Sequence, residues 1–556
     1  MTVRAVLTSL ARLWHTACHL KPVQIYGRLL SRFPRPLPGH GPAPPRRERM
    51  TAWRAPASRR PSLFGPRRFR LLNEEHDLDE VGWSGPGVTR LWRYNQHYFD
   101  DLNADDAEMR ATWHRALLDD WRDGNPPVRG PAWEPYPLSL RIVNLVKAEL
   151  SRPLLSAAME HSLARQCRAL ESRVEWHLLG NHLFSNAKAL VFGGCFFDGP
   201  EADRWLKQGL AILAAQTPEQ VLADGGHFER SPMYHALALE DLLDLHNLLS
   251  AYSGRLGRQD EAAQGWISEL PIRIASMVAW LEAMTHPDGQ IALFNDAAFG
   301  VAPSPADLAC YASRLSCPRP STASRLTASG YVRLERGPAV CILDVAPLGP
   351  DYLPAHGHAD TLSFELSIDG ARVLVDTGVS QYGSGPQRLR ERGTAAHNTV
   401  TVAGRDSSEV WGGFRVARRA HPHGLVIDED QEAAVVTCRH DGYARLPGRP
   451  VHARTWTLTA QSLTVIDEIT APLPAVSHWH WAPGCVIVPD PATAASGGQS
   501  CFTVRLPGGR TLSIRGQGLE WTHGDYAWHP EFGLSVPATG SAGQFLSSRS
   551  EVVIAW

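Results

Sequence analysis

The chain has 556 residues and a formal net charge of −2, with 43% hydrophobic and 20% charged residues. This length accommodates two or three domains, and the composition is typical of a folded globular protein. With a net charge so close to zero, the molecule as a whole is not attracted to nucleic acid or to an anionic membrane. Any acidic ligand must therefore be held by local positive groups.

The cysteines and the apolar runs exclude further classes. The nine cysteines are scattered and lack CxxC spacing, which argues against a disulfide framework and against a thiolate zinc site. No run approaches the ~18 apolar residues of a transmembrane helix. Arg4, Arg12 and His15 interrupt the first apolar runs, so no signal peptide is predicted. The cytoplasm, the periplasm and the cell envelope all stay open as compartments.

A basic, proline-rich segment follows. Residues 28–70 contain twelve arginines, nine prolines and a single acid, Glu48. The prolines prevent a long regular helix. The segment is either a basic arm that binds an anionic partner or an extended strap wrapped over the next domain, and the strap is the favoured interpretation. Residues 1–85 are therefore interpreted as an N-terminal arm.

Helical periodicity dominates from about residue 91 to residue 315. Apolar residues recur with 3.6-residue spacing in the segments 104–121, 156–179, 181–194 and 232–252. Ser231 is a good N-cap for the last of these, and Pro232 suits the first helical position. Successive amphipathic helices with short connections predict an α/α toroid or solenoid over residues 86–325.

From about residue 329 the period changes to two. In residues 361–378 alternating apolar residues precede and follow Asp369-Gly370, a pair that favours a type I′ hairpin turn. Residues 397–404, 454–469 and 551–556 continue the pattern. Residues 326–556 are therefore predicted to form an antiparallel β-sandwich, with a cleft between the two domains.

Two polar clusters fall in the helical region. Asn181 and His182 begin one predicted helix, where they are either functional or a polar helix start. Residues 224–235 form a glycine-containing loop that is rich in titratable side chains and leads into another predicted helix. Such a loop is either a ligand-binding loop or a solvent-exposed loop without a function. The loop carries Tyr234 in the first helical turn, where the helix dipole slightly favours the ionised phenol.

Two further clusters precede predicted strands. One is the segment 356–360, with His356 and His358, and the other is the segment 396–399, with His397. Asp376 ends the intervening hairpin. His358, Asp376 and His397 are suitable zinc ligands, and hydrogen-bonded structural histidines are the alternative.

The sequence around these clusters resembles the heparinase II/III-like polysaccharide lyases, a superfamily that includes related alginate lyases. The resemblance is carried, in order, by residues 92–102, 178–194, 224–245, 356–366, 375–378 and 396–402. It implies an incomplete α/α toroid followed by an antiparallel β-sandwich. It also implies a lyase that cleaves an acidic, uronate-containing polysaccharide by β-elimination.

The resemblance assigns roles to five residues. Asn181 and His356 would neutralise the substrate carboxylate and so stabilise the charge that develops when C5 loses its proton. Tyr234 matches the catalytic tyrosine that acts as general acid, general base or both. His182 would assist as a base or orient the sugar, and Tyr382 is the candidate for a second tyrosine contributed by the sandwich.

Further residues are predicted to support the site. Arg230 and His235 would supply positive charge beside a tyrosine base, and substrate contacts are expected from the loop that holds them and from a basic run near residue 390: His227, Glu229, Arg230, His235 and Arg388. A solvated loop is the alternative for the basic run. By resemblance to heparinase II, His358, Asp376 and His397 would bind a structural zinc ion. No organic cofactor is expected.

Three other functions stay open. A uronyl C5-epimerase would share the first proton abstraction but would yield no cleavage product. A glycoside hydrolase using two of Asp224, Glu229 and Asp288 is disfavoured, because the Asn/Tyr/His set does not fit hydrolysis. A non-catalytic glycan-binding protein of exopolysaccharide assembly is the third. The particular glycan, endo or exo cleavage and the oligomeric state are not predicted.

Overall fold

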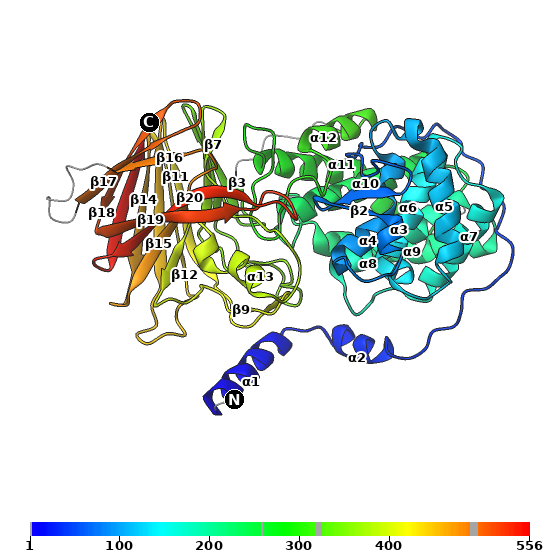
Figure 1. Cartoon of the computed structure of the whole chain (residues 1–556), viewed down its shortest axis with the longest axis horizontal. Helices are drawn as coiled ribbons and strands as arrows, with labels where there is room; N and C mark the ends of the chain where they lie inside the picture. The colour runs from blue at the N-terminus through cyan, green and yellow to red at the C-terminus, as the bar shows by residue number, and fades with distance from the viewer. Residues whose placement is uncertain (1–2, 257–258, 319–324, 490–498) are drawn as a thin grey trace.

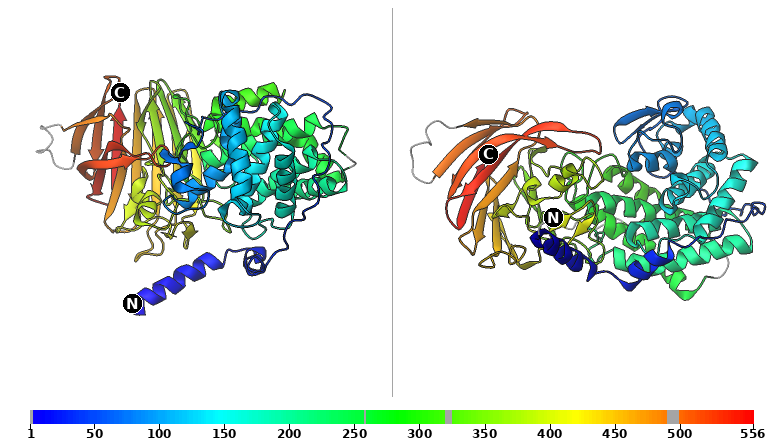
Figure 2. Two further views of the ribbon diagram at one scale, coloured as in Figure 1. Left: turned by 45° about the vertical axis from the view of Figure 1, so that its right-hand side comes forward. Right: turned by 60° about the horizontal axis from the view of Figure 1, so that its bottom comes forward.

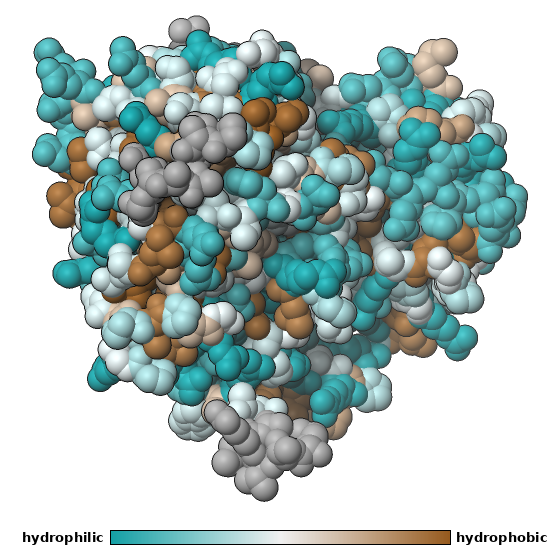
Figure 3. Space-filling model, turned by 60° about the vertical axis from the view of Figure 1, so that its left-hand side comes forward, coloured by the Kyte–Doolittle hydropathy of each residue, from teal (hydrophilic) through white to brown (hydrophobic). Residues whose placement is uncertain are grey.

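The computed structural model describes residues 3–256, 259–318, 325–489 and 499–556. They form a helical domain followed by a domain of antiparallel sheets (Figure 1). Two helices, α1 (Val3–Ala17) and α2 (Pro22–Leu30), lie along one side of this body. On the face shown in Figure 3 hydrophilic residues predominate, and hydrophobic ones occur in small patches.

The arginine-rich segment runs over the helical domain. Arg46 Nη1 lies 2.6 Å from Glu149 Oε1, and Arg47 Nη2 lies 2.7 Å from Asp203 Oδ1. The segment ends in a hairpin of β1 (Arg68–Leu71) and β2 (Glu74–Asp77). Because these arginines pair with acids of the same chain, this part of the arm follows the strap interpretation.

Nine helices of nine or more residues form the helical domain within the described ranges: α4 (Arg90–Tyr98), α5 (Ala111–Gly124), α6 (Pro135–Ser151), α7 (Ala157–Glu171), α8 (Gly180–Phe196), α9 (Pro200–Gln220), α10 (Pro232–Ala251), α11 (Glu261–Ala283) and α12 (Pro305–Arg314). A short helix, α3 (Leu78–Val81), precedes them. No helix in the described part of the chain is both long and apolar enough to cross a bilayer.

The helix ends test the sequence predictions directly. The side chain of Ser231 accepts a hydrogen bond from the backbone N–H of Tyr234 at 3.2 Å, so the predicted N-cap is confirmed. The predicted helix 156–179 is wrong beyond Glu171, where α7 ends. Asn186 accepts a hydrogen bond from the backbone N–H of Glu175 at 2.8 Å, and this tertiary contact holds residues 172–179 in a turn.

Three antiparallel sheets form the second domain. The five-stranded sheet has the order β3 (Arg325–Leu326), β4 (Tyr331–Arg336), β5 (Ala339–Asp344), β6 (Phe364–Ile368), β7 (Ala371–Leu374). The four-stranded sheet has the order β19 (Leu519–Trp528), β20 (Val536–Phe545), β15 (Ala475–His480), β8 (Val400–Val402). The eight-stranded sheet has the order β11 (Pro422–Glu429), β12 (Ala433–His440), β13 (His452–Thr459), β14 (Ser462–Ile469), β21 (Arg549–Ala555), β18 (Thr511–Gln517), β17 (Gln499–Arg505), β16 (Val486–Pro489).

Two details of the sheets matter for the site. Asp369 and Gly370 join β6 to β7 with φ angles of 50° and 82°, as the predicted type I′ turn requires. The loops around this hairpin carry the short helices α13 (Pro386–Glu391) and η4 (Thr394–Ala396) and a small hairpin of β9 (Val410–Trp411) and β10 (Arg415–Val416). These loops lie at the end of the sandwich that faces the helices (Figure 2).

Each domain has its own apolar core, and a third cluster joins them. In the sandwich, the ring of Phe364 lies 6.4 Å from Trp456 and 5.7 Å from Trp479, which packs the sheets face to face. At the junction, Trp280 of α11 packs against Tyr331 of β4 with ring centroids 5.9 Å apart. Because such contacts are short-ranged and close-packed, the junction fixes how the two domains face each other.

A buried ion pair ties the sandwich to the loops near the helices. The Arg454 guanidinium on β13 contacts Asp467 on β14 at 2.6 Å and donates hydrogen bonds to the backbone carbonyls of Leu362 and Asn398 at 2.7 and 2.6 Å. Both charged side chains are buried. Burial alone would raise the pKa of Asp467, but the Arg454 charge outweighs it and holds that pKa below its usual range.

We expect Arg454→Ala to lower the free energy of unfolding by about 3–5 kcal/mol, because it leaves the buried Asp467 with only His452 as a partner, without the arginine charge, and two buried carbonyls without a donor. Since the pKa of Asp467 is depressed in the folded state, this contribution is present at neutral pH and lost on acidification. Denaturant unfolding at neutral pH measures the loss. The control Arg549→Ala removes a partly exposed pair with Glu551 and should cost no more than about 1 kcal/mol. Equal losses in the two variants would contradict the assigned role.

Candidate active site

A cavity of about 1290 Å³ lies between the helical domain and the loops of the sandwich domain. Its helical wall comes from the start of α8 and from the loop before α10, and its other wall comes from the loops around residues 351–356 and 382–383. Seven of the predicted site residues line it: Asn181, His182, His227, Glu229, Tyr234, His356 and Tyr382. Segments far apart in the sequence therefore meet at one cavity.

Two tyrosines from opposite walls touch in this cavity. Tyr234 Oη lies 3.0 Å from Tyr382 Oη, and the Tyr234 ring lies over His356 with a centroid distance of 4.0 Å. Burial raises the pKa of both phenols well above the usual value, and the charge of Asp296 adds to the shift. The predicted helix-dipole effect on Tyr234 is thus outweighed by burial, and the phenols are protonated at neutral pH.

His356 is held from behind by a buried carboxylate. His356 Nδ1 lies 2.8 Å from Asp296 Oδ2, and His358 Nε2 lies 2.8 Å from Asp296 Oδ1. Arg388 binds the same carboxylate through both of its terminal nitrogens, with Nη2 at 2.6 Å from Oδ2. Burial alone would raise the pKa of Asp296, but Arg388 and the two histidines hold it well below the usual range.

Asp296 is absent from the predicted site. The signal is present in the sequence, because Asn295-Asp296 interrupts the apolar segment 291–299. A carboxylate between buried apolar residues requires a buried partner. No local pattern identifies Arg388 as that partner, since it lies 92 residues further along the chain.

Glu229 faces His356 across the cavity. Its Oε2 lies 3.8 Å from His356 Nε2, and neither carboxylate oxygen accepts a well-formed hydrogen bond from the described residues. Burial raises the pKa of this carboxyl, while the charges of His356 and His182 oppose the shift. Burial also lowers the pKa of the neighbouring His227 to about 3, so that imidazole is neutral.

His182 is oriented by a second carboxylate. Its Nδ1 lies 3.2 Å from Glu175 Oε2, and its ring packs 4.5 Å from that of Tyr136. An ionised carboxylate only accepts hydrogen bonds, so Nδ1 carries a proton, and in the neutral imidazole Nε2 is then the acceptor of the ring. Glu175 and Tyr136 were not predicted.

The structure does not bring three predicted substrate-binding residues to the cavity. His235 is fully buried, with Nε2 2.9 Å from the carbonyl of Met277 and Nδ1 accepting from the His227 backbone. Arg230 donates to the carbonyl of Ser329 at 2.9 Å, and Arg388 is committed to Asp296. Arg230 and His235 therefore do not supply positive charge to Tyr234, because tertiary hydrogen bonds turn both side chains elsewhere.

The three predicted zinc ligands lie close together behind His356. His397 Nδ1 lies 2.6 Å from Asp376 Oδ2, and the rings of His358 and His397 are 5.3 Å apart. His358 Nδ1 and His397 Nε2 are buried and have no hydrogen-bond partner among the described residues. Within those residues, no group of three or more His, Cys, Asp or Glu side chains is arranged to hold a metal ion. In the structure His397 is hydrogen-bonded to Asp376 and His358 to Asp296, so the zinc site stays a prediction.

Comparison with known protein families accounts for both domains. The family model described as heparinase II/III N-terminus matches residues 104–304, and the one described as heparinase II/III-like, C-terminal, matches residues 318–554. The chain belongs to the heparinase II/III-like family. The predicted family is confirmed.

Individual relatives of this family are distant. The FtsZ-localized protein C of Caulobacter vibrioides is 28% identical over 64% of this chain and 58% of its own length. A heparin-sulfate lyase of Bacteroides stercoris is 26% identical over 60% of this chain and 56% of its own length. The chain thus spans little more than half the length of these two relatives.

Solved structures of the family share the fold. A heparan sulfate lyase mutant from Pedobacter heparinus superposes with a TM-score of 0.58 and 18% identity, covering 88% of this chain and 81% of that one. The predicted fold class, an incomplete α/α toroid followed by an antiparallel β-sandwich, is confirmed.

We expect Asp296→Asn to lower the free energy of unfolding by about 3–5 kcal/mol, because it leaves the buried Arg388 guanidinium without a counter-charge. Thermal or denaturant unfolding measures the change. Asp119→Asn is a matched control, because Asp119 pairs with Arg122 at 2.6 Å on the exposed side of α5 and Arg122 keeps a second acidic partner, Asp123. That control should cost about 1 kcal/mol or less. An Asp296→Asn protein as stable as the control would refute the idea that this carboxylate organises the site.

Proposed function

We propose that the chain is a polysaccharide lyase that cleaves an acidic, uronate-containing glycan by β-elimination. The observation that carries the proposal is the meeting of Asn181, Tyr234, His356 and Tyr382 from both domains in one cavity. Family membership supports it, as do the names of relatives that act on heparin sulfate. The glycan itself is not identified by any of these observations.

Neutralisation of the substrate carboxylate is the first requirement of this chemistry. A uronate C5–H becomes acidic enough to be removed only when negative charge on the neighbouring carboxylate is stabilised as it develops. Asn181 supplies an amide, and His356 supplies an imidazole whose Nδ1 is bound to Asp296. With Asp296 accepting from Nδ1, a protonated His356 presents its Nε2–H to the cavity and donates to the substrate carboxylate.

Proton transfer completes the reaction. A base removes the C5 proton, the electron pair forms the C4–C5 double bond, and the C4–O bond breaks. Tyr234 is protonated and stands next to Tyr382, so it is suited to protonate the leaving oxygen. His182 has an acceptor Nε2 fixed by Glu175 and is the candidate base. A tyrosine would serve as the base only after substrate binding had lowered its pKa.

A screen of glycans tests the proposal. Heparan sulfate, alginate, hyaluronan and the exopolysaccharide of the host are each incubated with the protein, and new unsaturated ends are followed by their near-ultraviolet absorbance. A lyase produces such ends on at least one substrate. Deuterium incorporation at C5 without cleavage would instead identify an epimerase, and binding without either change would identify a non-catalytic glycan-binding protein.

We expect Tyr234→Phe to lower kcat by about 10²–10⁴-fold on the substrate found in the screen, because one proton-transfer group is lost. Substrate binding should survive, since the ring still packs over His356. Tyr252→Phe makes the same change just beyond the C-terminus of α10, away from the cavity, and should leave kcat unchanged. Near-normal turnover by a folded Tyr234→Phe protein would remove Tyr234 from the mechanism.

We also propose that His358, Asp376 and His397 hold a structural zinc ion. The unpartnered nitrogens of His358 and His397 support this, although Asp376 would have to turn from His397 toward the ion. The zinc ion would hold together the loops that carry His356 and would take no part in the reaction. Elemental analysis of purified protein should find about one zinc per chain, and His358→Ala should lose the metal and lower Tm. If no metal copurifies or can be added back, the hydrogen-bonded cluster is the native state.

A further inference from the structure

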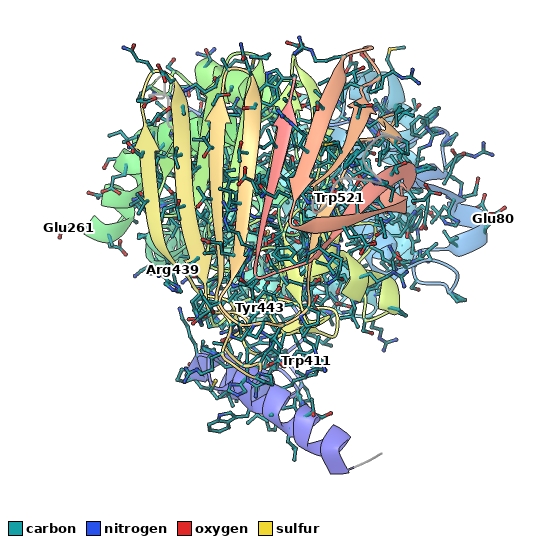
Figure 4. All side chains as sticks on the ribbon, turned by 90° about the vertical axis from the view of Figure 1, so that its left-hand side faces the viewer. Glu80, Glu261, Trp411, Arg439, Tyr443 and Trp521 are labelled. Atoms are coloured by element: carbon teal, nitrogen blue, oxygen red, sulfur yellow. The ribbon has the colours of Figure 1, made fainter. Side chains whose placement is uncertain are left out.

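The two N-terminal helices contact the body mainly through polar side chains, and Val23 of α2 also packs against the core of the helical domain. On α1, Thr16 Oγ1 donates to the carbonyl of Val416 at 3.1 Å and accepts from Trp411 Nε1 at 3.1 Å, and Trp411 lies beside α1 in Figure 4. On α2, the buried Gln24 donates to the carbonyl of Tyr352 at 3.0 Å. A helix on the surface of a soluble protein normally does the opposite and buries its apolar face.

The opposite faces of these helices are apolar and exposed. Positions three and four apart share one face of a helix, and the exposed aliphatic residues fall at such positions: Leu10 and Leu13 on α1, and Ile25, Leu29 and Leu30 on α2. Exposed aromatic residues accompany them, with Trp14 at 69% and Phe33 at 66% relative exposure. Both helices lie on the same side of the body in every view of Figures 1 and 2, so the apolar faces point outward together.

This apolar face is surrounded by positive charge. The first 47 residues contain no Asp or Glu, and basic residues occur throughout them. Lys21 is neutralised by Glu219, but Arg28 and Arg32 form no ion pair with any described residue. The net charge of −2 for the whole chain therefore conceals a strongly basic end.

We propose that α1 and α2 form a docking face for an anionic lipid bilayer. An interfacial helix combines a broad apolar face with Trp, Phe and Leu and with flanking Lys or Arg, and anionic headgroups attract the arginines. Because a bilayer surface is flat, it can contact α1 and α2 at the same time, since both helices lie on one side of the body. Arg28 and Gln24 also line the interdomain cavity, so the docked bilayer lies beside that cavity.

Vesicle binding of the full chain tests the proposal. Co-sedimentation is measured with vesicles of phosphatidylglycerol and phosphatidylcholine and with vesicles of phosphatidylcholine alone. We expect strong binding to the anionic vesicles and weak binding to the neutral ones. The double variant Leu29→Glu/Leu30→Glu should weaken binding by roughly tenfold or more, because two apolar side chains no longer enter the interface. Arg28→Ser/Arg32→Ser should weaken it by roughly fivefold for each arginine removed.

A matched double variant controls for general surface effects. Met109→Glu/Ile272→Glu changes two of the most exposed apolar side chains on the helical domain and should leave vesicle binding unchanged. All variants should keep the Tm of the parent, since the outer faces of α1 and α2 contribute no contact to the body. Equal binding to both kinds of vesicle, or equal loss in the control variant, would overturn the proposal. Self-association that the Leu29→Glu/Leu30→Glu change abolishes, without vesicle binding, would show that a second copy of the chain covers this face.

Discussion

The site depends on one buried carboxylate. Asp296 lies in the segment that follows α11, and its carboxylate forms an ion pair with Arg388 of α13 and hydrogen bonds with His356 and His358. This one side chain therefore orients the loops of the sandwich domain. A buried charge of this kind is tolerable only when its partners are in place. The same interaction therefore closes the domain junction and fixes the direction of the His356 ring in the cavity.

Burial sets the protonation of the groups in front of this carboxylate. The two phenols have raised pKa values and are neutral, and His227 has a lowered pKa and is neutral as well. The part of the cavity around Tyr234 and His356 therefore contains no ionised phenolate that would repel an anionic ligand. Arg388 does not line the cavity itself, and it acts on the site from behind, through its ion pair with Asp296 and through its position 5.0 Å from the centre of the Tyr382 ring.

The basic N-terminal region divides into two parts with different physical roles. From Arg46 onward the arginines pair with acids of the helical domain and act as a strap. Before that point the chain has basic residues, exposed apolar side chains and no acids. The net charge of the molecule averages over these parts, and for this reason a prediction from overall charge misses a local surface suited to anionic lipid.

Helix periodicity, strand alternation, capping and turn chemistry are local, and for this reason the fold class, the Ser231 cap and the Asp369-Gly370 turn could be predicted from the sequence. Family motifs added the identities of Asn181, Tyr234 and His356. Three other features depend on tertiary contacts: Asp296 and Arg388 hold His356, Arg230 and His235 turn away from the cavity, and Tyr234 meets Tyr382. Those outcomes depend on which buried polar groups find each other across many residues of chain, and no local pattern encodes that choice.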